Sequence, residues 1–270
     1  MRSLHFISGL PRSGSTLLSA ILAQNPRFHA SMSGPVAGLV GTLLHEMSGK
    51  NEFSVFIDDT QRESLLRAMF DAYYANTPAD VVFDTSRDGC ARLPLLKTLY
   101  PPSKIIACVR HMPWVIDSIE QLVRRNVFQP SSIFSYLAGG TVYSRADGVA
   151  RAEGLVGHAY NALKEAYFSP DAPGRLLLLQ YETLVGDPAR AIRAIYDFID
   201  EPDFAHDFDN LRFDAEEFDR KAGTPGLHSI RARVGAQERQ SVLPPDLFRR
   251  FENDAFWRDG AQRRAGIAVV

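Results

Sequence analysis

The chain has 270 residues, of which 45% are hydrophobic, and it carries a formal net charge of −2. This size and composition predict one large α/β domain, and the near-neutral charge excludes a global field that would favour nucleic acid. No apolar stretch is long enough to span a membrane, the first predicted strand begins almost at the N-terminus, and only two cysteines occur. We therefore expect a cytoplasmic protein without a signal peptide or a disulfide framework, and Cys108 as a buried free thiol.

Near-continuous apolar runs predict four buried strands, and the segments between them show helical periodicity. The strands are Leu4–Ser8, Val81–Asp84, Lys104–Arg110 and Leu176–Tyr181. The helices are Ser15–Gln24, Val36–Met47, Gln61–Tyr74, Ala91–Leu99, Pro113–Arg125 and Val149–Tyr167, and another opens at an Asp187-Pro188 cap and runs through Phe198. The alternation predicts a doubly wound parallel sheet of the P-loop type in a single domain, 1–270, with ligands at the carboxyl ends of the strands.

The first strand runs into Gly9-Leu10-Pro11-Arg12-Ser13-Gly14-Ser15-Thr16. This segment fits the P-loop pattern except that Ser15 stands at the lysine position. Its backbone N–H groups and the dipole of the following helix would form an anion site, and Arg12 adds a planar cation suited to phosphate or sulfate oxygens. The missing lysine points away from ordinary ATP or GTP hydrolysis. A turn that merely joins a strand to a helix is the alternative.

Two more arginines follow predicted strands, and both would face the same crevice. Arg110 stands where many P-loop NTPases end a strand in a magnesium-holding aspartate, and Asp84 is the one candidate for such a role. Arg110 therefore suggests a second anionic group on the ligand, to which Ser118 could add a hydroxyl about two helical turns later. Alternatively, Arg110 forms a surface ion pair, and Arg87 lies in solvent beside a turn capped by Asp84 or Asp88.

The charge changes sign late in the chain. Residues 197–219 hold ten acids and one basic residue, whereas residues 220–250 hold seven lysines and arginines and two acids. The two stretches are either solvated faces of opposite charge, or the basic segment 220–250 folds back over an anionic ligand.

At these motifs the sequence resembles the sulfotransferases that use 3′-phosphoadenosine-5′-phosphosulfate (PAPS). The loop at residues 9–16 is similar to their 5′-phosphosulfate loop, and Cys108-Val109-Arg110 through Ser118 is similar to their 3′-phosphate motif. The resemblance extends from about residue 4 to about residue 250. It includes Gln180-Tyr181-Glu182-Thr183-Leu184, residues 99–104 and, in the style of the tyrosylprotein sulfotransferases, Lys221-Ala222-Gly223 and Leu243-Pro244-Pro245-Asp246.

The resemblance implies a role for each matching position. Pro11, Arg12, Ser13, Gly14, Ser15 and Thr16 would hold the 5′-phosphosulfate, Arg110 and Ser118 would hold the 3′-phosphate, and Tyr181 would lie near the nucleotide. Arg12 is also expected to be catalytic, together with Arg87, which corresponds to a lysine that steadies the bridging oxygen. A helical insertion around 126–168 and a donor-covering segment at 220–250 are expected. No metal is expected, the product would be adenosine 3′,5′-bisphosphate, and the protein would be a monomer or a homodimer.

Two departures from the family pattern leave residues open. Ser33 occupies the position at which tyrosylprotein sulfotransferases place a catalytic glutamate, so Glu46, His45, His228 and Asp88 are candidates for the base. Leu122 sits at the spacing of the second 3′-phosphate arginine, for which Arg124 or Arg125 can substitute.

The acceptor is a hydroxyl compound that the sequence does not identify: a small molecule, a lipid or a peptide tyrosine. Phe128, Phe134, Tyr136 and Tyr143 either form an aromatic acceptor pocket or belong to the core. Two other functions stay open, an atypical P-loop nucleotide kinase and a non-catalytic nucleotide-binding module.

Overall fold

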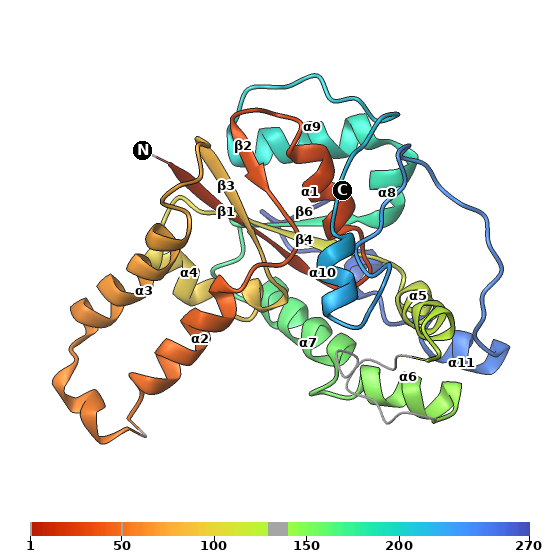
Figure 1. Ribbon diagram of the computed structural model, residues 1–270, viewed down its shortest axis with the longest axis horizontal. Coiled ribbons are helices and arrows are strands. Elements are labelled where there is room, and N and C mark those ends of the chain that lie inside the picture. Colours follow the sequence, from red (N-terminus) through yellow and green to blue (C-terminus); the bar gives the residue numbers. More distant parts are fainter. Residues whose placement is uncertain (1, 50, 129–139) are drawn as a thin grey trace.

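One sheet of six parallel strands organises the protein, in the order β2-β3-β1-β4-β5-β6 (Figure 1). The computed structural model describes residues 2–49, 51–128 and 140–270. The strands are β1 (Ser3–Gly9), β2 (Phe28–Ala30), β3 (Val81–Thr85), β4 (Ile105–Val109), β5 (Leu176–Gln180) and β6 (Ala268–Val269). Because β1 pairs with β3 on one side and β4 on the other, the loops that follow these three strands open at the same edge of the sheet.

Helices cover both faces of the sheet. On one face, α1 (Ser15–Leu22), α8 (Tyr181–Gly186) and α9 (Pro188–Ile199) pack around Ile7 of β1. The other face, around Phe6, carries α2 (Val36–Glu46), α3 (Asp59–Tyr73), α4 (Leu93–Leu99), α5 (Met112–Arg125), α6 (Val142–Ala150), α7 (Leu155–Phe168) and α11 (Pro245–Arg250). The short helix α10 is formed by Glu216–Lys221. Adjacent residues of one buried strand thus supply two cores, which explains its unbroken apolar sequence.

The predicted parallel α/β fold is confirmed, and all four predicted strands are present. β2 and β6 are not among the predicted strands, because three and two residues are too few to show a strand pattern. The predicted cap of α9 is confirmed, since the Asp187 side chain accepts a hydrogen bond from the Arg190 amide at 3.1 Å. Cys90 and Cys108 are buried free thiols. No helix in the described ranges is long and apolar enough to cross a membrane.

The single helix predicted over Val149–Tyr167 is wrong. The chain leaves the helical conformation at Arg151 (φ −60°, ψ 159°), which separates α6 from α7, and α7 begins after Gly154. The turn is so tight that a Cβ on Gly157 would lie 2.0 Å from the Arg151 carbonyl oxygen. The described part of 126–168 is largely helical, and the buried side of α7 packs into the core on the Phe6 face of the sheet.

Candidate functional site

The loop between β1 and α1 forms the floor of the site. Its Gly14, the N-cap of α1, is left-handed (φ 94°, ψ 12°) and supplies no capping side chain. Within the described ranges, no group accepts a hydrogen bond from the amides of Ser15, Thr16 or Leu17. These donors and the positive end of the helix dipole can therefore bind an anion. The Ser13 hydroxyl, in contrast, is buried and turns back toward the Pro11 carbonyl.

Close packing explains both glycines of the loop. At Gly9 (φ 102°), a Cβ would lie 2.2 Å from the Cys108 carbonyl oxygen on the neighbouring strand. At Gly14, a Cβ would lie 2.9 Å from the ring of Tyr181. The loop backbone is thus pressed between β4 and Tyr181, and any side chain at these two positions would separate them.

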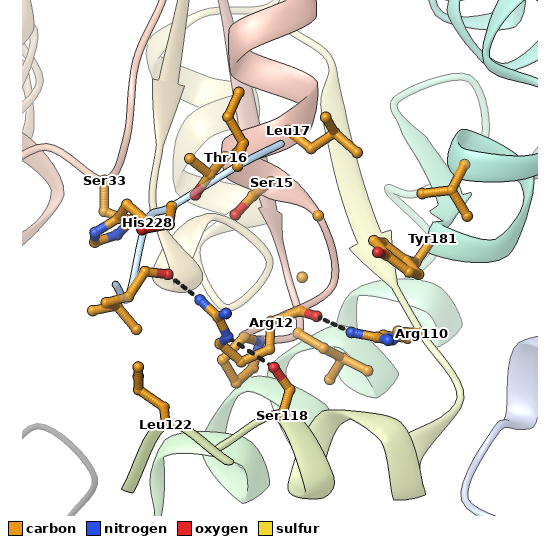
Figure 2. A pocket seen from close by; sticks show the side chains of 18 of the residues that line it. Arg12, Ser15, Thr16, Leu17, Ser33, Arg110, Ser118, Leu122, Tyr181 and His228 are labelled. Carbon is orange, nitrogen blue, oxygen red and sulfur yellow. Dashed lines mark hydrogen bonds between the residues drawn. The ribbon is translucent and has the colours of Figure 1, made fainter. Parts of the chain in front are cut away.

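Arg12 lies at the centre of the site (Figure 2). Its backbone is left-handed (φ 60°), a conformation that costs a non-glycine residue on the order of 1–2 kcal/mol. Its Nε donates to Ser118 Oγ at 3.1 Å, and its Nη1 donates to the Leu227 carbonyl. Burial, followed by the charge of Arg110, lowers the pKa of Arg12 to about 10. Its two hydrogen-bond partners are neutral and it forms no ion pair in the described structure, so a bound anionic group would stabilise its charge.

Arg110 follows β4 and stacks on Tyr181. Its guanidinium carbon is 4.1 Å from the centroid of the Tyr181 ring, and its Nη1 donates to the Arg12 carbonyl at 3.2 Å (Figure 2). Burial lowers the pKa of Arg110 as well. The structure thus brings together three residues that the sequence placed in the donor site from separate motifs.

Helix α5 supplies the next wall. Ser118, Leu122 and Arg125 all line the cavity. Arg124 does not, because its Nε pairs with the buried carboxylate of Glu120 at 2.9 Å. Of the two arginines expected to replace the second 3′-phosphate arginine, Arg125 is therefore the one in position.

Arg87 follows β3 in the 3₁₀ turn Arg87–Gly89 and also lines the cavity. Although Arg87 keeps an exposed surface, desolvation by the protein around its guanidinium lowers its pKa, and it forms no ion pair with any residue in the described ranges. Asp84, three residues before Arg87, is buried and accepts a hydrogen bond from the Tyr74 hydroxyl at 2.7 Å. Burial raises the pKa of Asp84, which does not line the cavity, so the one strand aspartate that could have been a magnesium ligand does not face this site.

The basic C-terminal segment forms the opposite side of the cavity. Residues between Leu227 and Arg239 line it, within the 220–250 stretch expected to cover the donor. Asp117 of α5, which is fully buried, anchors this segment: its Oδ2 lies 2.6 Å from Arg239, and its Oδ1 accepts from Ser241 Oγ at 2.8 Å and the Val242 amide at 2.7 Å. A single carboxylate next to Ser118 thus ties the segment to α5.

The cavity, about 550 Å³ in volume, is strongly cationic. Seven arginines line it: Arg12, Arg87, Arg110, Arg125, Arg231, Arg233 and Arg239. No aspartate or glutamate is found in the described lining. Arg239 pairs with Asp117 and Arg233 with Asp209, which leaves five arginines without an ion pair in the described structure. Such a surface fits a ligand that carries several negative charges.

Three of the four predicted base candidates lie outside the cavity lining. His45 and Glu46 are exposed on α2, and the Glu46 carboxylate accepts a hydrogen bond from the Asn51 side chain at 3.2 Å. Asp88 pairs with Arg92 at 3.4 Å. The prediction that Glu46 is catalytic therefore finds no geometric support, because α2 directs the end of its last turn toward solvent.

His228 does line the cavity, together with Ser33 (Figure 2). Its Nδ1 lies 2.6 Å from the Oδ1 atom of Asp219, a carboxylate that is 2% exposed. The ring of Phe218, another lining residue, meets the imidazole edge to face at 5.5 Å. Neither Asp219 nor Phe218 is among the predicted site residues, because the loop that brings His228 back to α10 has no periodicity that reveals the contact.

Two of the four aromatic residues for which an acceptor pocket and the core were the alternatives, Phe128 and Tyr143, lie in the described part of the chain. Phe128 is 96% exposed, and the exposed Tyr143 donates its hydroxyl hydrogen to Asp246, so neither residue lines the cavity or belongs to the core. Phe134 and Tyr136 lie outside the described residues. Within the described ranges, no group of three histidine, cysteine, aspartate or glutamate side chains could hold a metal ion.

Comparison with known proteins identifies the family. The sulfotransferase domain from the curacin biosynthetic pathway is 21% identical, with a TM-score of 0.50 and 76% of each chain covered. A sulfotransferase from Alicyclobacillus acidocaldarius is 16% identical, with a TM-score of 0.47, 77% of this chain and 85% of that chain covered. The sulfotransferase domain of the Synechococcus PCC 7002 olefin synthase is 17% identical, with a TM-score of 0.46, 94% of this chain and 88% of that chain covered.

At such identities the first of these likenesses supports the fold alone. No curated protein matches the chain in sequence. A model of the sulfotransferase family, however, matches residues 5–206, which include the P-loop, Arg87, Arg110 and Ser118. The chain therefore belongs to the sulfotransferase family.

Proposed function

We propose that this sulfotransferase moves a sulfuryl group from PAPS to the hydroxyl of an acceptor and releases adenosine 3′,5′-bisphosphate. One observation carries the proposal: a cavity beside a lysine-free P-loop is lined by seven arginines, five of them without an ion pair in the described structure. PAPS is anionic at both ends, at its phosphosulfate and at its 3′-phosphate. The cavity offers cationic groups on two walls, from the loop and from α5.

The residues fit such a donor in two groups. The amides at the start of α1, with Arg12, Ser15 and Thr16, would hold the 5′-phosphosulfate. On the α5 side, Ser118 and Arg125 would hold the 3′-phosphate together with Arg110, and Tyr181 would lie against the nucleotide. Pro11 and Gly14 shape the loop, and Ser13 supports it from within.

In the proposed in-line transfer, the acceptor oxygen forms a bond to sulfur while the bond between sulfur and the bridging oxygen breaks. The hydroxyl proton passes to His228, the one base candidate that lines the cavity. Negative charge grows on the departing oxygen, where Arg12 and Arg87 stabilise it. Since both arginines already line the cavity beside the loop, little reorganisation would accompany the reaction.

Replacing Arg87 with glutamine should therefore lower turnover on the order of 10²- to 10³-fold, as loss of one donor to a developing oxyanion does. Binding of adenosine 3′,5′-bisphosphate should change far less, because the bisphosphate carries no sulfuryl group. Arg250→Gln is the matched control, since Arg250 forms an exposed ion pair with Asp147 outside the cavity. An Arg87→Gln enzyme with wild-type turnover would remove Arg87 from the mechanism.

One titration separates the proposal from its two alternatives. Tight binding of adenosine 3′,5′-bisphosphate without magnesium, measured by calorimetry, supports the PAPS site. Tight binding of ATP that needs magnesium, without bisphosphate binding, would instead identify an atypical nucleotide kinase. Turnover of ³⁵S-labelled PAPS with a panel of phenols, sugars, lipids and tyrosine peptides then tests catalysis, and bisphosphate binding without any transfer would leave a non-catalytic binding module.

A further inference from the structure

Helix α10 contacts His228 through two neighbouring side chains. Asp219 Oδ1 lies 2.6 Å from the imidazole Nδ1, and Asp219 Oδ2 accepts a hydrogen bond from the His228 amide at 2.8 Å. The ring of the preceding residue, Phe218, packs edge to face against the imidazole. One carboxylate thus fixes both the backbone and the ring of His228, and an aromatic side chain limits the rotation of that ring.

The contact with the Asp219 carboxylate sets the tautomer of the His228 imidazole. A carboxylate can only accept hydrogen bonds, so in the neutral imidazole the Nδ1 atom beside Asp219 carries the proton and Nε2 presents a lone pair. In the described part of the chain no group forms a hydrogen bond with Nε2, although the His228 side chain is only 14% exposed and lines the cavity. In its neutral form His228 therefore offers a proton acceptor, rather than a donor, at the cavity wall.

The charge of Asp219 matters as much as its geometry. An imidazole that takes up a proton becomes a cation, and it would do so in a cavity already lined by arginines. Burial and Arg110 lower the pKa of Arg12, and Asp219 acts in the opposite direction, which shows that its charge reaches the loop. Asp219 is buried and does not line the cavity, so it can stabilise the imidazolium without contacting an anionic donor directly.

We propose that Asp219 is a positioning residue for proton transfer: it holds His228 with Nε2 free to take the acceptor's proton and compensates the positive charge that His228 then gains. The proposal rests on the proposed sulfotransferase function. It predicts that Asp219→Asn lowers kcat on the order of 10²- to 10⁴-fold, the range for loss of a correctly oriented base. His228→Gln should cause a similar loss, and the double variant should lose little more than either single variant, because the two side chains act as one unit.

The first readout does not depend on turnover. Long-range ¹H–¹⁵N correlation spectra of the full chain, labelled at histidine, report the tautomer of each imidazole, and His228→Gln assigns the His228 signal. We expect the Nδ1–H tautomer in the wild type and a shift toward Nε2–H in Asp219→Asn, whose amide group can donate to Nδ1. A wild-type spectrum with the proton on Nε2 would overturn the proposal.

The second readout is transfer from ³⁵S-labelled PAPS to 4-methylphenol, with bisphosphate affinity as the check on folding. Asp246→Asn is the control, since Asp246 is an aspartate that bonds the exposed Tyr143 away from the cavity. Bisphosphate affinity within a few-fold of wild type, with kcat lost only in Asp219→Asn, supports the positioning role, and unchanged kcat in that variant overturns it. If the wild type binds no bisphosphate and transfers no label, the proposed function fails and the positioning role falls with it, whatever tautomer the spectra show.

Discussion

Replacing Arg110 with methionine would measure separately how the Arg110 charge affects the stability of the ligand-free protein and how it affects ligand binding. Burial lowers the pKa of Arg110, so the fold disfavours its charge, and its charge also lowers the pKa of Arg12. Methionine keeps much of the apolar stem but loses one hydrogen bond to the Arg12 carbonyl, worth about 1 kcal/mol, and the stacking on Tyr181, worth about 0.5–2 kcal/mol. Relief from burying the charge opposes both losses. We expect the free energy of unfolding of the ligand-free protein to change by no more than about 1 kcal/mol.

Binding should respond far more strongly than stability. Bisphosphate at 100 times its Kd stabilises a protein by about 2.7 kcal/mol, which raises Tm by roughly 5–11 °C in a domain of this size. Two lost hydrogen bonds from a cation to phosphate, at about 1.5 kcal/mol each, would weaken binding by roughly 100-fold. At the same concentration the ligand would then stand near its Kd and stabilise Arg110→Met by only about 0.4 kcal/mol, or about 1–2 °C. Thermal unfolding with and without bisphosphate measures both quantities on one sample.

Arg250→Met provides the control for this experiment. Arg250 also lies over an aromatic ring, 5.2 Å from the centroid of Phe251, and pairs with Asp147 at the surface. It should keep the full bisphosphate-induced rise in Tm. A full rise in Arg110→Met would refute the placement of the 3′-phosphate beside Tyr181. A ligand-free Tm lowered by more than about 10 °C would refute the energetic reasoning, because it would show that the buried charge is a net stabiliser.

Two further predictions concern the strands that carry the site. Gly9→Ala should lower the free energy of unfolding by about 3–5 kcal/mol, because its Cβ would overlap the Cys108 carbonyl in a left-handed backbone. Gly174→Ala is the control: its backbone is also left-handed (φ 72°) but its surroundings are open, so it should cost only about 1–2 kcal/mol. Equal losses in urea unfolding would show that backbone strain alone decides both. Burial, and then Lys104, lowers the pKa of His5 from 6.5 to about 4, so the unfolded chain takes up a proton first as the pH falls. The free energy of unfolding should therefore be highest above pH 6.5 and fall by about 3 kcal/mol toward pH 4. His5→Asn should make the free energy of unfolding less dependent on pH. Parallel pH profiles for the two proteins would exclude His5 as the source of the pH dependence.

The sequence predicts the residues of the proposed donor site because their motifs are local. Strand, loop and helix follow one another in residues 4–24, and Ser118 lies in α5, eight positions after Arg110. The parallel pairing of β1 with β4 then brings both motifs to the same edge without any further signal in the sequence. The proposed base could not be chosen in this way, because residue type and sequence distance leave four candidates, and only tertiary packing shows which of them lines the cavity.

The predicted boundaries of the helix over Val149–Tyr167 were wrong for a related reason. Val149 and Tyr167 both belong to apolar faces, so their spacing alone cannot reveal that Arg151 turns the chain between two helices. The contact between Asp117 and Arg239 crosses 122 positions and depends on a carboxylate that looks like an ordinary polar residue of a helix. Contacts of this kind have no local pattern, and they decide which stretch of the basic C-terminal segment reaches the cavity.

Two buried carboxylates occupy similar positions in this site, each next to a basic side chain that lines the cavity. Asp117 stands behind Arg239, and Asp219 stands behind His228, and neither faces the cavity. Negative charge in the lining would repel a polyanionic donor, but the same charge one layer behind can fix a basic side chain and stabilise its positive form. The Arg12 side chain reaches the carbonyl of Leu227, the residue directly before His228. The donor loop and the proposed base are therefore joined through a single peptide unit, so that a phosphosulfate drawing Arg12 toward itself would also act on the position of His228.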